Sequence, residues 1–93
     1  MRFEWDEHKN RANHAKHGIW FEEAQTVWAD ELGGEFHDPD HSEDEERFIR
    51  VGYSTRDRLL LVIFCERLDP DAIRIISARK ATRAERQAHE EGL

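Results

Sequence analysis

The sequence RFIRVGYSTRDRLLLVIFCER, Arg47–Arg67, decides the fold, because it predicts two strands joined by a short turn. The first run alternates with the strand period of two: Arg47, Ile49, Val51 and Tyr53 share one face, and Phe48, Arg50 and Gly52 share the other. The second run, Leu59–Cys65, is apolar at every position, which is typical of a central strand covered on both sides. The polar residues Thr55–Asp57 between the runs predict the turn of an antiparallel hairpin.

The residues before this hairpin predict one short strand and two helices. Arg2–Trp5 alternates charged and aromatic side chains, as a strand with two different faces does. Asp6 suits the N-cap of a polar helix that Gly18 would end. A second, amphipathic helix is expected to follow Trp20 and to be broken by the glycines at 33–34. Its apolar stripe consists of Phe21, Ala24, Val27 and Trp28.

The residues after the hairpin predict a last strand and a last helix. Ala72–Lys80 is strand-like, and Thr82 and Glu85 have the spacing of a capping box that would start a helix to about residue 91. An edge strand near Glu35–Asp38 is left open. Together the patterns predict an α+β fold with an antiparallel sheet of four to five strands, two N-terminal helices and one C-terminal helix.

Length and composition limit the organisation of the chain. Its 93 residues, 38% of them apolar, are expected to form a single small domain over residues 1–93. The longest apolar run, Leu59–Cys65, is far shorter than the roughly 20 residues of a membrane span, and the N-terminus lacks the apolar stretch of a secretory signal. The single cysteine, Cys65, is expected to be a buried small hydrophobe. We therefore expect a cytoplasmic protein.

Charge is distributed unevenly along the chain. The formal net charge is -7, yet residues 35–46 hold seven acids and no Lys or Arg, and elsewhere 14 acids face 14 Lys and Arg. The segment RIISARKATRAER, Arg74–Arg86, carries five cations and one carboxylate, Glu85. A nucleic-acid backbone is attracted by local potential within a Debye length of about 8 to 10 Å, so the acidic total does not exclude such a partner.

Segments spread over the whole chain resemble the BrnT family of bacterial type II toxins. They are EWDEHKNRANHAKHGIWFEEA at residues 4–24, EER at residues 45–47, Gly52, Arg58 and RIISARKATRAER at Arg74–Arg86. The resemblance implies a RelE-like fold and an endoribonuclease activity that blocks translation. It also implies a partner antitoxin, BrnA, which neutralises the toxin in a hetero-oligomer and binds operator DNA, so that the toxin would reach DNA only through it.

The cationic segment can be tested against this chemistry. A metal-independent ribonuclease needs a base for the ribose 2′-OH, cations for the scissile phosphate and an acid for the 5′-oxygen. The candidates for the phosphate are Arg74, Arg79, Lys80 and Arg83. In a regular strand, Arg74 and Lys80 project to one face. Arg79 then joins Ser77 on the other face. The cations of this strand can therefore all line one pocket only if the strand twists or bulges.

Other readings of these groups stay open. The start of the last helix at Thr82–Arg83 could seat a phosphate, but the cations could equally form a solvated face that neutralises nearby acids. His17 could be the base, since imidazole is the side chain best suited to proton transfer near neutral pH, or could only balance a helix dipole. Glu46 could also be the base, or Glu46 and Arg47 could pair with neighbours across the sheet. His14 is a further option, and Ser77 could bind phosphate or fill a tight spot.

The predicted catalytic set is therefore His17, Glu46, Arg47, Arg74, Ser77, Arg79 and Lys80, and the predicted RNA-binding set is Lys16, Arg58, Thr82 and Arg83. Among the tryptophans, Trp5 and Trp28 are expected to pack in the core, whereas Trp20 lies off the apolar stripe and would face a partner.

No metal or cofactor is expected. The stretch HDPDHSEDEE at residues 37–46 imitates the early spacing of a calcium loop, but it lacks glycine at the sixth position and has Ile49 where the twelfth-position carboxylate should be. His37 and His41 lack a convincing third ligand for a transition metal. The segment would rather be a mobile acidic loop that repels RNA or docks basic side chains of an antitoxin.

Two functions from different classes remain compatible with the sequence. One is the endoribonuclease toxin that the resemblance implies. The other is a catalytically silent module that only binds an antitoxin and acts in a DNA-bound repressor complex, because the same anion-binding surface would serve both.

Overall fold

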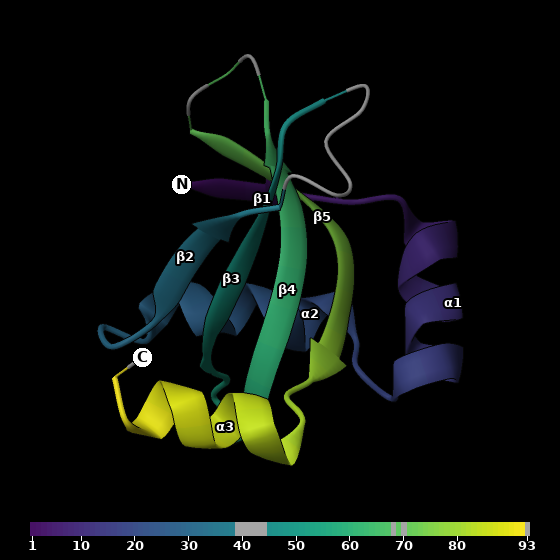
Figure 1. Ribbon diagram of the computed structural model, residues 1–93. Coiled ribbons are helices and arrows are strands. Elements are labelled where there is room, and N and C mark those ends of the chain that lie inside the picture. The colour runs from purple at the N-terminus through teal and green to yellow at the C-terminus, as the bar shows by residue number, and fades with distance from the viewer. Residues whose placement is uncertain (39–44, 68, 70, 93) are drawn as a thin grey trace.

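A computed structural model of the chain describes residues 1–38, 45–67, 69 and 71–92, and it shows a five-stranded sheet with three α-helices (Figure 1). The strands are β1 (Arg2–Glu4), β2 (Gly34–His37), β3 (Arg47–Tyr53), β4 (Leu59–Glu66) and β5 (Ala72–Lys80). The helices are α1 (Glu7–His17), α2 (Phe21–Ala24), the 3-10 helix η1 (Gln25–Ala29) and α3 (Arg83–Glu90). No helix in these ranges is long and apolar enough to cross a membrane.

The hairpin of β3 and β4 forms as the sequence predicts. The two strands are antiparallel, and Arg47 lies opposite Cys65 while Tyr53 lies opposite Leu59. At the turn, the Ser54 N–H donates to the Arg58 carbonyl at 2.9 Å, and Asp57 takes a positive φ of 61°. Aspartate is one of the few residues that tolerate this left-handed conformation. The hairpin supplies the centre of the sheet, whose order is β1-β5-β4-β3-β2.

The outer strands settle two expectations about the sheet. The edge strand that the sequence left open exists as β2, which pairs antiparallel with β3. The N-terminal strand β1 pairs with β5 in parallel, from Arg2 beside Ala72 to Glu4 beside Arg74. The sheet is therefore mixed and not wholly antiparallel, since β1 joins it beside a strand that is distant in the sequence.

The helix boundaries follow the predicted caps. The Asp6 carboxylate accepts from the backbone N–H groups of His8 and Lys9 at the start of α1, and Gly18 ends that helix with a φ of 74°. The second predicted helix begins at Phe21 but tightens to 3-10 geometry after Ala24, and it ends before the two glycines are reached. The capping box that starts α3 is present.

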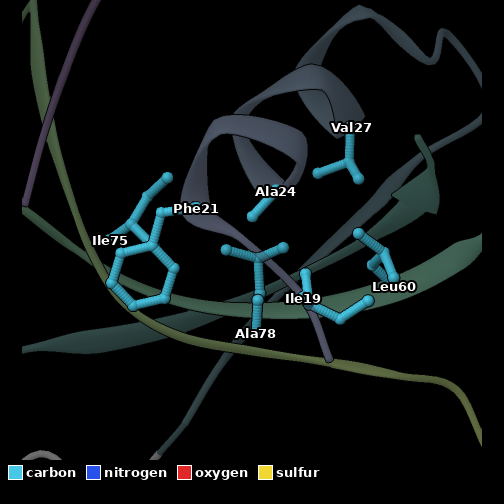
Figure 2. Close-up of a cluster of buried hydrophobic side chains, with 8 residues drawn as sticks. Ile19, Phe21, Ala24, Val27, Leu60, Ile75 and Ala78 are labelled. Atoms are coloured by element: carbon cyan, nitrogen blue, oxygen red, sulfur yellow. The ribbon is translucent and has the colours of Figure 1, made fainter. Parts of the chain in front are cut away.

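One face of the sheet, covered by α2 and η1, holds the hydrophobic core. Figure 2 shows the cluster in which residues of the second helical segment meet strand residues. Its members are Ile19, Phe21, Ala24, Val27, Leu60, Val62, Ile75 and Ala78. Trp5 packs edge-on against Phe21 and Trp28 against Phe64, which confirms that both rings are packing residues. Cys65 is a free, buried thiol, as predicted.

The opposite face of the sheet is only partly covered. β4 is central in the sheet, as predicted, and Leu59–Cys65 is buried on both faces except at Ile63, which is half-buried. The helix α3 crosses one end of this face (Figure 1) and has no fully buried residue. We call the uncovered part the open face. The hairpin residues Arg47, Ile49 and Ile63 lie on this face.

Candidate functional site

A β-bulge in β5 reorders the cationic strand. Ile63 pairs with Ser77, whereas the next residue of β4, Phe64, pairs with Ile75, so Ile76 is an extra residue without an opposite partner on β4. Beyond the bulge Arg79 lies opposite Leu61 and therefore faces the open side. The expectation that β5 alternates regularly between its two faces is therefore wrong at this point. The bulge that a pocket shared by these side chains would require is present.

Because of this bulge, side chains from four elements line one cleft of about 480 Å³ on the open face. Its polar lining comes from the end of α1, from Asp38 after β2, from the start of β3 and from the end of β5. The residues are His17, Asp38, Arg47, Ser77 and Arg79, above a floor of Ile49, Leu61, Ile63 and Ile76. An imidazole, a hydroxyl, two guanidinium groups and a carboxylate thus lie together above an apolar floor, where charges are less screened than in water.

Arg79 is oriented by Glu85 of α3. Its Nη1 and Nη2 atoms donate to the two carboxylate oxygens at 2.8 and 2.9 Å, and Nη1 also donates to the Lys80 carbonyl at 3.2 Å. The bidentate bond to Arg79, together with the Thr82 N–H bond, lowers the pKa of Glu85 to about 2. A guanidinium has five N–H donors, so this pairing fixes Arg79 at the rim of the cleft without using all of them.

His17 is placed against β5 by a buried amide one turn earlier in α1. The Asn13 Nδ2 atom donates to the carbonyl oxygens of Ile19 and Ala78 at 2.8 and 2.9 Å, and its Oδ1 accepts from the Ala78 N–H at 3.1 Å. Ala78 stands between Ser77 and Arg79, the two polar cleft residues of β5. Asn13 therefore ties the end of α1, which bears His17, to the strand segment that bears Ser77 and Arg79.

A second buried amide completes this attachment. Asn10 is fully buried, and its Oδ1 accepts from the Phe21 N–H at 2.7 Å. Asn10 and Asn13, and Asp38 as a cleft residue, were not predicted from the sequence. Two asparagines three residues apart in a helix with few apolar residues were the available signal, because buried amides need partners and usually indicate a structural clamp. Asp38 was hidden among the acids of its segment, and its N–H bonds the Arg47 carbonyl at 2.9 Å.

The other predicted cations and the helix start do not line the cleft. Arg74 lies on the open face opposite Cys65, below the bulge. Lys80 is exposed and lies opposite Leu60, so it projects to the helix-covered side, contrary to its predicted place in the site. Thr82 accepts the Glu85 N–H in the capping box, while Arg83 is exposed at the first turn of α3. Because the Glu85 carboxylate already occupies that helix start, it is a poor phosphate seat.

Three further predicted residues also lie elsewhere. Lys16 is exposed on α1. Glu46 forms an ion pair with His37, so it is engaged across the β2–β3 pair. Arg58 binds the buried carboxylate of Glu23, with Nε to Oε2 at 2.9 Å, on the helix-covered side. The hydrogen bond from Arg58 is the main cause that lowers the pKa of Glu23, and the Ser54 hydroxyl adds to it. The guanidinium of Arg58 is therefore engaged with a buried carboxylate of the fold.

Half of the predicted acidic loop, residues 39–44 of 35–46, lies outside the described residues, and so does His41 of the rejected metal site, whereas residues 35–37 belong to strand β2. Among the described residues, no three His, Cys, Asp or Glu side chains are grouped as a metal site.

Comparison with known proteins places the chain in a family. The model of the family described as "Ribonuclease toxin, BrnT, of type II toxin-antitoxin system" matches residues 5–85. The crystal structure of the Brucella abortus ribonuclease toxin BrnT is similar over 89% of this chain and 99% of that chain, with 26% sequence identity and a TM-score of 0.64. A search of curated proteins found no match. The family match begins just after β1 and covers the other four strands and the start of every helix, and the chain therefore belongs to the BrnT family of ribonuclease toxins of type II toxin–antitoxin systems.

Proposed function

We propose that the cleft on the open face is the site where this toxin cleaves RNA without a metal ion. The observation that carries the proposal is the bulge at Ile76, because it brings Ser77 and Arg79 to the face that already holds His17 and Arg47. Those groups match the needs of phosphodiester cleavage by the neighbouring ribose hydroxyl: a titratable base, cations for the phosphate and a hydrogen-bond donor.

The roles follow from the chemistry of each group. His17 accepts the proton of the 2′-OH as its oxygen attacks phosphorus. Arg47 and Arg79 stabilise the negative charge that builds on the phosphate, since guanidinium groups bind phosphate oxygens in pairs. The Ser77 hydroxyl donates to a non-bridging oxygen. The 5′-oxygen then leaves and is protonated from solvent, so the products are a 2′,3′-cyclic phosphate and a 5′-hydroxyl.

His17 is a better base than Glu46, which was the other candidate. His17 lines the cleft at the end of α1, and Asn13 fixes that helix end beside Ser77 and Arg79. Glu46 is exposed and bound to His37. We therefore assign the general base to the imidazole, and RNA phosphates flanking the scissile one would meet the cations Arg74 and Arg83.

The cellular role is proposed from the family. RNA cleavage by the free toxin in the cytoplasm would inhibit translation, and a BrnA-like antitoxin would neutralise the toxin in a hetero-oligomer that reaches operator DNA through the antitoxin. The ribonuclease description of the family favours this role over the catalytically silent module.

The decisive experiment uses two adjacent residues of β5 that face opposite sides. Purified, antitoxin-free protein is incubated with a long RNA in EDTA, alone and with ribosomes, beside the variants Arg79→Gln and Lys80→Gln. We expect Arg79→Gln to lower the cleavage rate about 100-fold, because one charged donor to the transition state is lost. Lys80→Gln should stay within about threefold, since its charge lies outside the cleft.

Three results would contradict the proposal. They are equal losses for the two variants, cleavage that needs an added divalent ion, and a folded parent protein that leaves both free and ribosome-bound RNA intact. Circular dichroism of each variant checks the fold, and mass spectrometry of the RNA ends checks for the cyclic phosphate.

A further inference from the structure

A second groove lies on the helix-covered side of the molecule, away from the cleft. It has a volume of about 560 Å³ and is formed by the first turn of α1, by α2 with η1, and by the turn between β3 and β4. The residues that matter for its chemistry are Glu7, Trp20, Glu22, Glu23 and Arg56. Neither the catalytic proposal nor the core uses this surface.

Trp20 gives the groove an exposed aromatic wall. Its side chain is 39% exposed, whereas Trp5 and Trp28 pack against the core. One face of the Trp20 ring stacks on His14, with centroids 3.8 Å apart and planes 9° apart. The indole is therefore held rigidly by α1 at the groove, and rigid aromatic rings are preferred contact groups at protein interfaces.

Two carboxylates beside this ring keep their negative charge without a cation. Glu7 and Glu22 both accept from the same Asn10 Nδ2 atom, at 3.1 and 2.9 Å. A neutral amide positions both groups but does not neutralise them, and no described residue forms an ion pair with either one. Glu23 differs, because Arg58 already balances it.

We infer that this groove docks a basic segment of the protein partner that a type II toxin has, with an arginine or lysine side chain between Trp20 and the carboxylates of Glu7 and Glu22. An aromatic face next to carboxylates is a favourable environment for an ammonium or guanidinium group. The inference rests on the antitoxin partnership of the proposed function. It adds a docking surface on the opposite side of the sheet from the RNA cleft.

The charges of the groove select against other occupants. RNA and anionic lipid would be repelled by Glu7 and Glu22, and an acidic peptide would be as well. Arg56 is the one cation among the described residues that line the groove, and it stands at the end formed by the hairpin turn. Arg56 should weaken the attraction of a basic side chain, so its removal should strengthen binding, whereas removal of a groove carboxylate should weaken it.

The test measures affinity for the cognate antitoxin by calorimetry with the full-length toxin. We expect Glu22→Gln to raise the dissociation constant about fivefold and Arg56→Gln to lower it about two- to threefold, because each changes one charge near a partly exposed cation. Trp20→Ala should raise it about tenfold or more. Both charge effects should shrink in 0.5 M salt.

The matched control is Glu31→Gln, which removes the same charge from an exposed residue outside the groove and should leave the affinity within twofold. Two outcomes overturn the inference. One is an unchanged affinity in both Glu22→Gln and Trp20→Ala, and the other is a weakening by Arg56→Gln as large as that by Glu22→Gln, which would indicate a general disturbance. RNA cleavage by the antitoxin-free variants should equal that of the parent. If the parent cuts no RNA, the proposed activity fails while the affinities still decide the role of the groove.

Discussion

The two faces of the sheet use alternate residues of the same strands in opposite ways. On the helix-covered face, β4 contributes Leu60, Val62 and Phe64, all of which are buried almost completely. On the open face it contributes Leu61 and Ile63, which form the floor beneath Arg79 and His17. The contrast shows how a chain of 93 residues can keep one well-packed core and still leave a charged cleft: each strand divides its side chains between stability and binding.

The largest expected effect separates two neighbours in β4. Phe64→Ala should lower the free energy of unfolding by about 3–5 kcal/mol, because its buried ring contacts Trp28 and Phe48. Ile63→Ala should cost only about 1 kcal/mol, since this half-buried side chain faces the cleft. Urea unfolding followed by tryptophan fluorescence measures both. Similar losses for the two variants would refute the division of the strand into a core face and an open face.

A smaller effect tests the clamp that joins the two regions. Asn13→Ala should lower the free energy of unfolding by about 2–3 kcal/mol, because it leaves the Ala78 N–H and two carbonyl oxygens without their buried partner. We also expect RNA cleavage per folded molecule to fall, since His17 is no longer held against β5.

The control for this clamp is Lys16→Ala, an exposed position on the same helix that should change stability by less than about 0.5 kcal/mol. Unfolding in urea and cleavage assays at matched folded concentration give the two readouts. If the Asn13→Ala variant were destabilised but fully active, Asn13 would stabilise the fold without positioning His17 for cleavage.

The smallest effect concerns the link between α3 and the open face. The bond from Arg79 lowers the pKa of Glu85 from 4.5 to about 2, so this carboxylate binds protons less readily in the folded state. Its contribution to stability is therefore complete above pH 4.5 and is lost as the pH falls toward 2. Because the pair is partly exposed, we expect Glu85→Gln to reduce stability at pH 6 by less than about 1 kcal/mol.

Thermal unfolding between pH 2 and 6 measures this contribution. The difference between the parent and Glu85→Gln should narrow as the solution is acidified, whereas Glu31→Gln should show no such convergence. A gap that stays constant down to pH 2 would mean that the ion pair with Arg79 does not stabilise the fold.

Most elements of the fold were predictable because their signals are local. The caps at Asp6, Gly18 and Thr82 involve only neighbouring residues, and all three are present. The hairpin also followed from its own alternation and turn. The parallel pairing of β1 with β5 was not predictable in this way, because it joins segments about 70 residues apart and leaves no mark on the pattern of either one.

The candidate site was predicted less completely. His17, Arg47, Ser77 and Arg79 were chosen from residue type and family resemblance, and the structure brings them to one cleft. Lys80 and Arg58 were chosen on the same grounds and lie outside it. Residue type shows that a side chain can bind phosphate, but the direction in which it projects depends on the pairing of its strand.

By itself, the sequence determined where strands and helices begin, which strand is central and that the C-terminal segment is cationic, since these properties depend on a few neighbouring residues. Only the tertiary structure decided which cations face the cleft. The bulge at Ile76 arises from the fit of β5 against β4, and the pairing of Arg79 with Glu85 arises where α3 returns to that strand. A shift of one residue in register exchanges the two faces of a strand, so non-local packing selected the site from the candidates that the sequence offered.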